Sequence, residues 1–239
     1  MFNAIKFLFN WTWPVIAFAS LSFVAIAGLD YWQQNNERDY RIENMEKSTV
    51  KIVIGQGHGS GVLLEAPNGE VYIITAGHVA DISSGKTNTP PQDILVYTSE
   101  GVAHSAYVVW ISSTDDVALL KLNNSYNLKG ATIMCDRAPV GTKVEIIGAP
   151  APSGFTLDWM HTYATIGGYY YHVGTEDSIM LFDGSVYGGS SGGPMFNEEG
   201  YVVGIVVAMF GDFGGWGSLI PMGFNVGVSS DIICDHMGW

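Results

Sequence analysis

The sequence predicts an all-β protein of about eleven short strands. Runs rich in Val, Ile and Tyr recur from residue 48 onward, and turn residues such as Pro67-Asn68-Gly69 separate them. No helical period of useful length interrupts these runs. A polar break at residues 123–141 divides the strands into two groups. Two packed six-stranded antiparallel barrels, over about residues 48–125 and 135–230, would accommodate them.

Each expected strand combines β-branched or aromatic residues with flanking turn residues. In chain order, the first group is expected at 49–54, 60–66, 70–75, 93–98, 106–111 and 117–122, and the second at 142–148, 162–173, 178–182, 201–210 and 224–230. After residue 48, the last eleven residues, SSDIICDHMGW, are the one segment for which a helix is expected.

The N-terminus has a different composition. Residues 11–29 carry no charge over a length that can cross a bilayer as a helix. Lys6 precedes this segment and acidic residues follow it, which predicts that residues 1–10 stay cytoplasmic. Aromatic residues at both ends favour a retained signal anchor, whereas Ala25-Ile26-Ala27 would suit a cleaved signal peptide. Residues 30–47 are polar enough for a flexible or helical spacer.

The net charge of the protein limits the classes of molecule that it can bind. The net charge is −13, and because the charges of residues 1–41 cancel, all of it belongs to residues 42–239. A domain this acidic is a poor ligand for nucleic acid or anionic lipid headgroups. Its acidity is explained by solubility. Since no metal-ligand spacing or cofactor-binding motif occurs, no metal and no organic cofactor are expected.

Three segments offer groups for nucleophilic catalysis. His78 ends a strand in YIITAGHVA, Asp116 opens one in STDDVALLKL, and Ser191 lies in GGSSGGP. A serine hydroxyl is a weak nucleophile until a base takes its proton, and the base needs a carboxylate that orients it. The chain therefore holds, in the order His, Asp, Ser, the base, the orienting carboxylate and the hydroxyl that an activated serine nucleophile requires.

These segments resemble the trypsin-like, chymotrypsin-fold serine proteases, and within them the HtrA-like branch. TAGHV, DDVALLKL and GSSGGP match the family's three catalytic motifs, and the resemblance covers about residues 48–233. It selects Asp116 over Asp115 and Ser191 over Ser190. It implies a serine endopeptidase that acts on polypeptides, with His78 as general base.

The resemblance also implies an oxyanion hole and a substrate pocket. The backbone amides of Gly189 and Ser191 would stabilise the negative oxygen of the acyl-transfer transition state. Uncharged residues would line the pocket for the residue before the scissile bond, which favours small or medium apolar side chains: Ser185, Val207, Met209 and Gly227. The glycine-rich segment 209–218 is expected as a loop beside this pocket, either gating it or merely exposed.

Several alternatives remain open. Cys135 and Cys234 are expected to be buried thiols, but in this fold the linker between the barrels passes near the C-terminal segment, so a disulfide is the second hypothesis. Surface or packing roles are expected for His58, His104, His161, His172 and His236. The domain is expected outside the cytoplasm, without a C-terminal PDZ domain, and possibly as a homo-oligomer. The functional alternative is a catalytically silent homologue that binds peptides.

Overall fold

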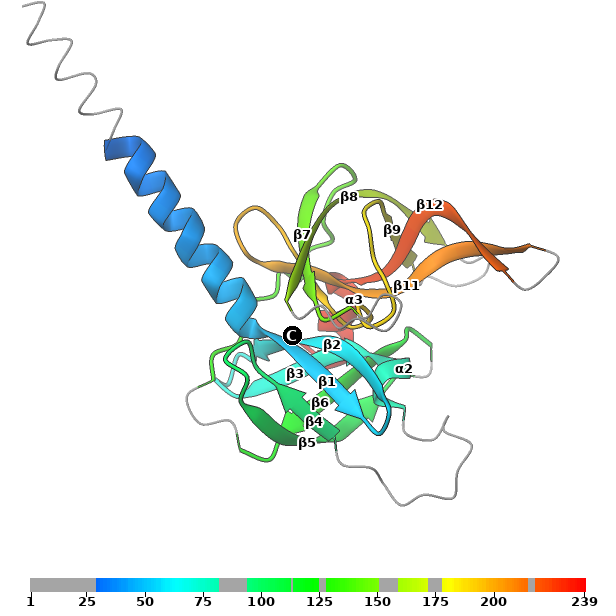
Figure 1. Ribbon diagram of the computed structural model, residues 1–239, viewed down its shortest axis with the longest axis horizontal. Helices are drawn as coiled ribbons and strands as arrows, with labels where there is room; N and C mark the ends of the chain where they lie inside the picture. Colours follow the sequence, from blue (N-terminus) through cyan, green and yellow to red (C-terminus); the bar gives the residue numbers. More distant parts are fainter. Residues whose placement is uncertain are drawn as a thin grey trace, which may run out of the picture. The chain divides into compact units, whose positions relative to one another are not determined.

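The computed structural model describes residues 29–81, 94–112, 114–124, 128–150, 159–171, 178–214 and 218–239. Within these residues, twelve strands form two closed antiparallel barrels (Figure 1). The all-β, two-barrel part of the predicted fold class is therefore confirmed. The segment predicted to be a membrane anchor or signal peptide, residues 11–29, lies outside the described residues except for Leu29. Among the described residues, no helix combines the length and the apolar character that crossing a bilayer requires.

The first barrel contains strands β1 to β6. Around the barrel the order is β1 (Thr49–Ile54), β2 (Gly57–Glu65), β3 (Val71–Ala76), β6 (Val117–Leu122), β5 (Ala103–Ile111) and β4 (Ile94–Tyr97). β4 pairs with β1, so the barrel leaves no unpaired strand edge. A one-turn helix, α2 (Gly77–Ala80), follows β3 directly.

The second barrel has the order β10 (Pro194–Phe196), β11 (Val202–Gly214), β12 (Ser218–Ser229), β9 (Ser178–Phe182), β8 (Met160–Tyr171) and β7 (Lys143–Gly148), and α3 (Ser230–Met237) follows β12. The prediction of eleven strands missed β10, because three residues behind a glycine-rich turn carry no readable alternation. The expectation of a loop is wrong for residues 209–214 and 218, and residues 215–217 lie outside the described residues. β11 reaches Gly214 and β12 begins at Ser218, and the two strands pair from Gly204–Ser229 to Gly214–Ser218.

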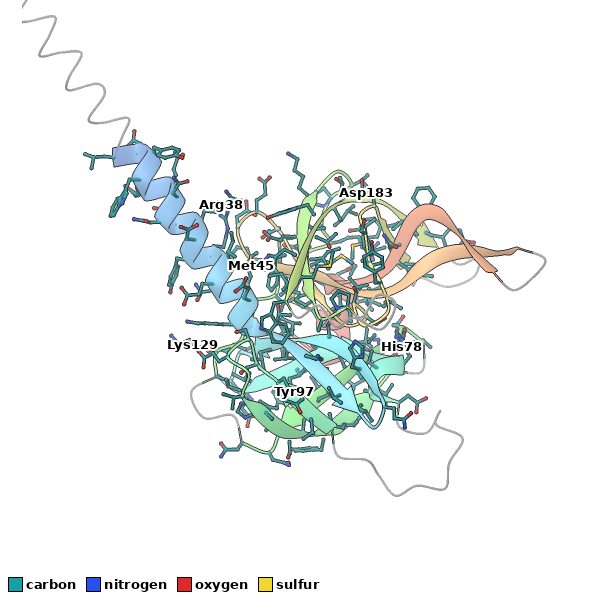
Figure 2. All side chains as sticks on the ribbon, viewed as in Figure 1. Arg38, Met45, His78, Tyr97, Lys129 and Asp183 are labelled. Carbon is teal, nitrogen blue, oxygen red and sulfur yellow. A yellow bond between two sulfur atoms is a disulfide. The ribbon has the colours of Figure 1, made fainter. Side chains whose placement is uncertain are left out.

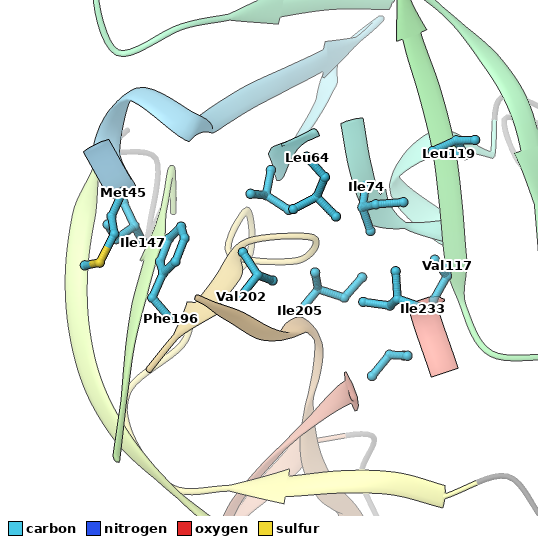
Figure 3. Close-up of a cluster of buried hydrophobic side chains, with 12 residues drawn as sticks. Met45, Leu64, Ile74, Val117, Leu119, Ile147, Phe196, Val202, Ile205 and Ile233 are labelled. Atoms are coloured by element: carbon cyan, nitrogen blue, oxygen red, sulfur yellow. The ribbon is translucent and has the colours of Figure 1, made fainter. Parts of the chain in front are cut away.

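The strands facing the other barrel are buried on both faces, which explains their nearly continuous apolar sequences. Along β2, Leu63 points into the first barrel, whereas Val62 and Leu64 point into the cluster between the barrels. This follows from the two-residue period of a strand. The inter-barrel cluster (Figure 3) contains Met45, Val62, Leu64, Ile74, Val117, Leu119, Ile147, Phe196, Val202, Ile205, Val228 and Ile233. The two barrels therefore share this cluster, in addition to the separate apolar core inside each barrel.

Residues 29–48 are helical, which confirms the helical alternative for the spacer. The helix ends where Ser48 Oγ and Thr49 Oγ1 donate hydrogen bonds of 3.0 and 2.8 Å to the Met45 carbonyl. The last turn is also joined to the second barrel through His161 on β8. Its Nε2 lies 2.8 Å from Glu46 Oε1, and its Nδ1 lies 2.6 Å from Glu145 Oε1. His161 is therefore part of an ion-pair bridge, beyond the surface or packing role expected from the sequence.

This bridge predicts pH-dependent stability. The hydrogen bond that the His161 ring donates to Glu145 raises the pKa of His161, burial opposes the shift, and Glu46 adds to it. A raised histidine pKa contributes stability that is complete below about 6.5 and is lost as the pH rises through the folded-state pKa. His161→Gln should therefore lower Tm at pH 6 by roughly 2–4 °C, from about 1 kcal/mol, and by less at pH 9.

Differential scanning calorimetry of both proteins across this pH range measures the difference. His104→Gln is the matched control, because His104 makes no ion pair among the described residues. A difference between wild type and His161→Gln that stays constant from pH 6 to pH 9 would contradict the bridge.

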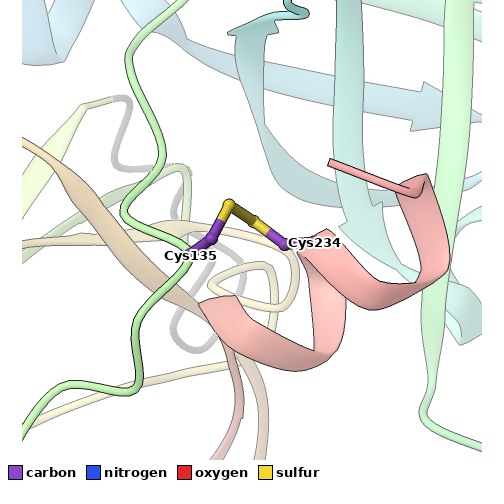
Figure 4. Close-up of a disulfide and its surroundings, with 2 residues drawn as sticks. All are labelled: Cys135 and Cys234. Atoms are coloured by element: carbon purple, nitrogen blue, oxygen red, sulfur yellow. A yellow bond between two sulfur atoms is a disulfide. The ribbon is translucent and has the colours of Figure 1, made fainter.

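Cys135 and Cys234 form a disulfide with a Cα–Cα distance of 5.6 Å (Figure 4). The favoured expectation of two buried thiols is therefore wrong, and the second hypothesis is correct. The physical reason is the position of α3, which packs back onto the linker between the barrels. An ion pair of 2.6 Å between Arg137 Nη2 and Asp231 Oδ2 holds the same two segments together.

Candidate active site

The pairing of β3 with β6 brings two predicted site residues to one edge of the first barrel. Ala76 at the end of β3 pairs with Val117 at the start of β6. The residues just beyond these strand ends, His78 in α2 and Asp116, must therefore lie together. Gly77 N–H donates a 2.8 Å hydrogen bond to the Asp116 carbonyl, which ties the two turns. Figure 2 shows His78 at the α2 end of the first barrel.

Asp116 holds His78 through both carboxylate oxygens. Oδ1 accepts the His78 backbone N–H at 2.7 Å, and Oδ2 lies 2.7 Å from the ring Nδ1. Asp116 has a φ of 52°, a left-handed conformation that aspartate tolerates better than most residues. If Nδ1 carries the proton that Asp116 accepts, Nε2 is left with its lone pair. The hydrogen bond that the His78 ring donates to Asp116 raises the pKa of His78, and burial partly opposes this shift.

The neighbouring carboxylate has a different partner. Asp115 Oδ2 lies 2.7 Å from Nε2 of His236 on α3 and also accepts hydrogen bonds from Thr114 and Ser112. Its side chain is only 9% exposed. Asp115 therefore joins the C-terminal helix to the loop before β6, while Asp116 faces His78.

The loop that carries Ser191 packs against β2 and β3. Ser60 N–H donates a 2.8 Å hydrogen bond to the Ser191 carbonyl. Gly59 lies between Val79 and that carbonyl, because a Cβ there would be 2.7 Å from the Val79 methyls and 3.1 Å from the oxygen. Val79 follows His78 directly, so the second-barrel loop is held against the segment that carries the imidazole.

Two backbone N–H groups of this loop lack an acceptor. Neither Gly189 N–H nor Ser191 N–H donates a hydrogen bond within the part of the chain that the structure describes. Gly189 has a φ of 95°, and a Cβ there would be 2.5 Å from His58 Nε2 and 2.6 Å from the Ala149 carbonyl. Only glycine suits this position. The two free donors are the groups predicted for an oxyanion hole.

The Ser191 hydroxyl has a partner other than His78. It donates a 3.0 Å hydrogen bond to the Val207 carbonyl on β11. No hydrogen bond joins it to the His78 ring among the described residues. His78 and the carboxylate of Asp116 are thus in contact, whereas the Ser191 hydroxyl is hydrogen-bonded to Val207. In unliganded sites the hydrogen bond between nucleophile and base is often long or absent.

The four predicted pocket residues have different surroundings. Ser185 is exposed, Val207 presents its carbonyl to Ser191, and the Met209 side chain lies outside the described part. Gly227 packs against the core residues Met195 and Met180, since a Cβ there would approach both side chains within 3.0 Å. Their common role in specificity stays a prediction.

Sequence reasoning did not select two buried polar residues near the site. Asn225 is 6% exposed, and its Nδ2 donates a 2.8 Å hydrogen bond to the Gly184 carbonyl beside Ser185. Ser60 is fully buried, and its hydroxyl hydrogen-bonds to Gly189 and Ala149. The sequence signal that could have identified both residues is a polar side chain inside an otherwise apolar strand. Such a side chain is buried, and a buried polar group needs a hydrogen-bond partner. For metals, the described residues contain no group of three His, Cys, Asp or Glu side chains that could hold an ion.

Comparison with known proteins gives consistent matches. A family model described as a trypsin-like peptidase domain matches residues 59–205. The chain is 29% identical over 178 residues to a probable serine protease do-like of Buchnera aphidicola, covering 74% of the chain and 33% of the relative. It is 29% identical over 156 residues to the serine protease Do-like HtrA of Bacillus subtilis, covering 62% of the chain and 33% of that protein. It spans about a third of these relatives.

A solved structure agrees with the fold. The serine endoprotease from Yersinia pestis superposes with a TM-score of 0.64 at 22% identity, over 84% of this chain and 65% of that one. At this level of identity the match establishes the two-barrel architecture alone.

Proposed function

The chain belongs to the trypsin-like peptidase family, and from this membership we propose that it is a serine endopeptidase. In the proposed mechanism, Ser191 attacks the peptide carbonyl, while His78 takes the hydroxyl proton and later gives it to the leaving amine. Asp116 orients His78 and stabilises the imidazolium. The observation that carries the proposal is the Asp116–His78 pair held against a loop whose Gly189 and Ser191 N–H groups donate no hydrogen bond among the described residues.

The proposed oxyanion hole uses backbone N–H groups, which explains why the loop that carries Ser191 needs no charged side chain. As the carbonyl carbon becomes tetrahedral, its oxygen gains negative charge, and the N–H groups of Gly189 and Ser191 would stabilise this charge. Removing one such donor typically lowers kcat by about 10²–10³-fold. No metal or cofactor is required for this chemistry. The proposed substrates are polypeptides with a small or medium apolar residue before the scissile bond, based on Ser185, Val207, Met209 and Gly227.

We also propose an extracytoplasmic location. The Cys135–Cys234 disulfide supports it, because such bonds persist in oxidising compartments and are rare in the cytosol. The uncharged segment 11–29 would tether the domain to a membrane or be removed as a signal peptide.

One observation favours a second candidate function. The Ser191 hydroxyl is hydrogen-bonded to the Val207 carbonyl and is therefore not directed to a base. This contact favours a catalytically silent homologue that binds peptides. A reactive serine separates the two functions, since only an activated hydroxyl displaces fluoride from a fluorophosphonate.

The test is labelling of the purified full chain with a fluorophosphonate probe. Wild type should be labelled, Ser191→Ala should not, and the control Ser190→Ala should retain labelling, since its hydroxyl only accepts the Tyr187 N–H. Equal labelling of wild type and Ser191→Ala would contradict Ser191 as the nucleophile. A folded wild type that takes no label would favour the peptide-binding function.

A further inference from the structure

We propose that Ser60 is a positioning residue that, from the first barrel, orients the loop whose N–H groups form the oxyanion hole. This role rests on the endopeptidase function proposed above. Ser60 lies on β2 of the first barrel, whereas both predicted oxyanion donors belong to the second barrel. It is fully buried and makes three hydrogen bonds across the interface.

The hydrogen bonds of the Ser60 hydroxyl have a defined direction. Ala149 N–H donates to Oγ at 2.9 Å, and the Gly189 carbonyl lies 2.7 Å from Oγ. A carbonyl oxygen can only accept, so the single hydroxyl proton must point to Gly189. The hydroxyl therefore bridges the residue after β7 and the oxyanion loop.

Ser60 holds the carbonyls of both proposed oxyanion residues. Its hydroxyl binds the Gly189 carbonyl, and its backbone N–H binds the Ser191 carbonyl at 2.8 Å. Both carbonyl groups are hydrogen-bonded to β2. Among the described residues, the N–H groups of Gly189 and Ser191 are the backbone polar groups of these two residues that have no hydrogen-bond partner.

Three consecutive peptide units of the loop, from Gly189 to Gly192, are restrained by hydrogen bonds. In the unit joining Gly189 to Ser190, the carbonyl is held by Ser60 and the N–H by the Tyr187 carbonyl at 2.9 Å. In the next unit, the Ser190 carbonyl accepts Gly193 N–H at 2.9 Å, which leaves Ser191 N–H as its free end.

In the third unit, the Ser191 carbonyl is held by Ser60, and Gly192 N–H donates to the Val206 carbonyl at 2.7 Å. Of these restraints, only the one on the Gly189 carbonyl depends on a side-chain proton. Loss of the Ser60 hydroxyl would release the Gly189 carbonyl and so loosen the Gly189 Cα. The preceding Gly188–Gly189 unit, which carries Gly189 N–H, is attached through this Cα and could then turn that N–H away from the substrate oxygen.

The role predicts a specific defect in transition-state binding. A peptide ending in valine aldehyde reacts with Ser191: the Ser191 oxygen bonds to the aldehyde carbon, the carbonyl electron pair moves to its oxygen, and the hydroxyl proton passes to His78. That oxygen then occupies the oxyanion hole. The corresponding peptide alcohol binds the same subsites but has no electrophilic carbon, so the ratio of the two inhibition constants isolates the oxyanion contribution.

The experiment measures both inhibition constants for the full chain and for Ser60→Ala. We expect the aldehyde to bind Ser60→Ala about 10- to 100-fold more weakly, somewhat less than the loss of a whole donor, with the alcohol unchanged within twofold. Ser60→Cys keeps a weak donor and should give an intermediate ratio, and it is read alone if Ser60→Ala does not fold. Ser48→Ala, which also removes a buried hydroxyl bonded to a backbone carbonyl, should leave the ratio unchanged.

Ratios in Ser60→Ala and Ser60→Cys equal to that of wild type would overturn the role of Ser60, and so would a parallel weakening of aldehyde and alcohol. A wild type that binds aldehyde no better than alcohol would instead overturn the endopeptidase function, and the role of Ser60 with it. The two failures are thus distinguishable in one data set.

Discussion

Replacement of Asp116 by asparagine is expected to lower kcat/KM for a peptide substrate by about 10⁴-fold, or roughly 5 kcal/mol in the transition state. The amide keeps the size of the carboxylate but loses its charge. It can also present an N–H₂ group to His78 Nδ1, which favours the tautomer with the proton on Nε2, where the base needs its lone pair. Steady-state kinetics of the full chain measures the loss.

The pH profile of the same variant tests the cause. The hydrogen bond that His78 donates to Asp116 is the largest factor that raises the pKa of His78 above its usual value. A general base acts in its unprotonated form, so wild-type activity should fall as the pH drops through this raised pKa. In Asp116→Asn the acidic limb should move to lower pH.

Asp115→Asn is the matched control, because it makes the same chemical change one residue away, at the carboxylate that faces His236. The activity of Asp115→Asn should stay within about tenfold of wild type. The acidic limb of its pH profile should match that of wild type. Comparable losses in Asp115→Asn and Asp116→Asn would argue against the assignment of Asp116.

Removal of the disulfide is expected to have the largest effect on stability. Cys135 and Cys234 are 99 residues apart, and the chain-entropy model assigns a loop of that size roughly 4–5 kcal/mol. Measured losses for native disulfides are about 2–5 kcal/mol. The double variant Cys135→Ser/Cys234→Ser should therefore unfold roughly 10 °C below wild type.

Calorimetry with and without a reductant supplies the control. Reductant should lower Tm of wild type toward that of the double variant and leave the double variant unchanged. A double variant within 2 °C of oxidised wild type would show that the Arg137–Asp231 ion pair and the packing of α3 suffice without the disulfide.

The strands that were predicted well are those whose sequences alternate or are apolar throughout. β1, β6 and β9 have the predicted bounds. The sequence could not say which face of β2 or β3 belongs to which core, since both faces are apolar and only the packed barrels distinguish them. β10 escaped prediction because a three-residue strand is defined by its partners, β7 and β11, and not by its own pattern.

The candidate site shows a similar division. The motifs predicted His78, Asp116 and Ser191 as site residues, and the structure places His78 and Asp116 in direct contact. They carried no information on the Ser191 rotamer or on the partner of Asp115, both of which depend on contacts across more than ten residues of sequence. Ser60 escaped notice because its role follows from the interface between the barrels, which no local spacing describes.

The division of the proposed machinery between two barrels affects the order in which the protein becomes active. His78 and Asp116 belong to the first barrel to leave the ribosome, and Ser191 belongs to the second. In the proposed mechanism, a nascent chain would carry a base without a nucleophile until residue 191 is made, and its nucleophile would lack the Ser60 contact until the two barrels pack together. Proteolytic capacity would then require the completed interface, and partly synthesised chains would lack it.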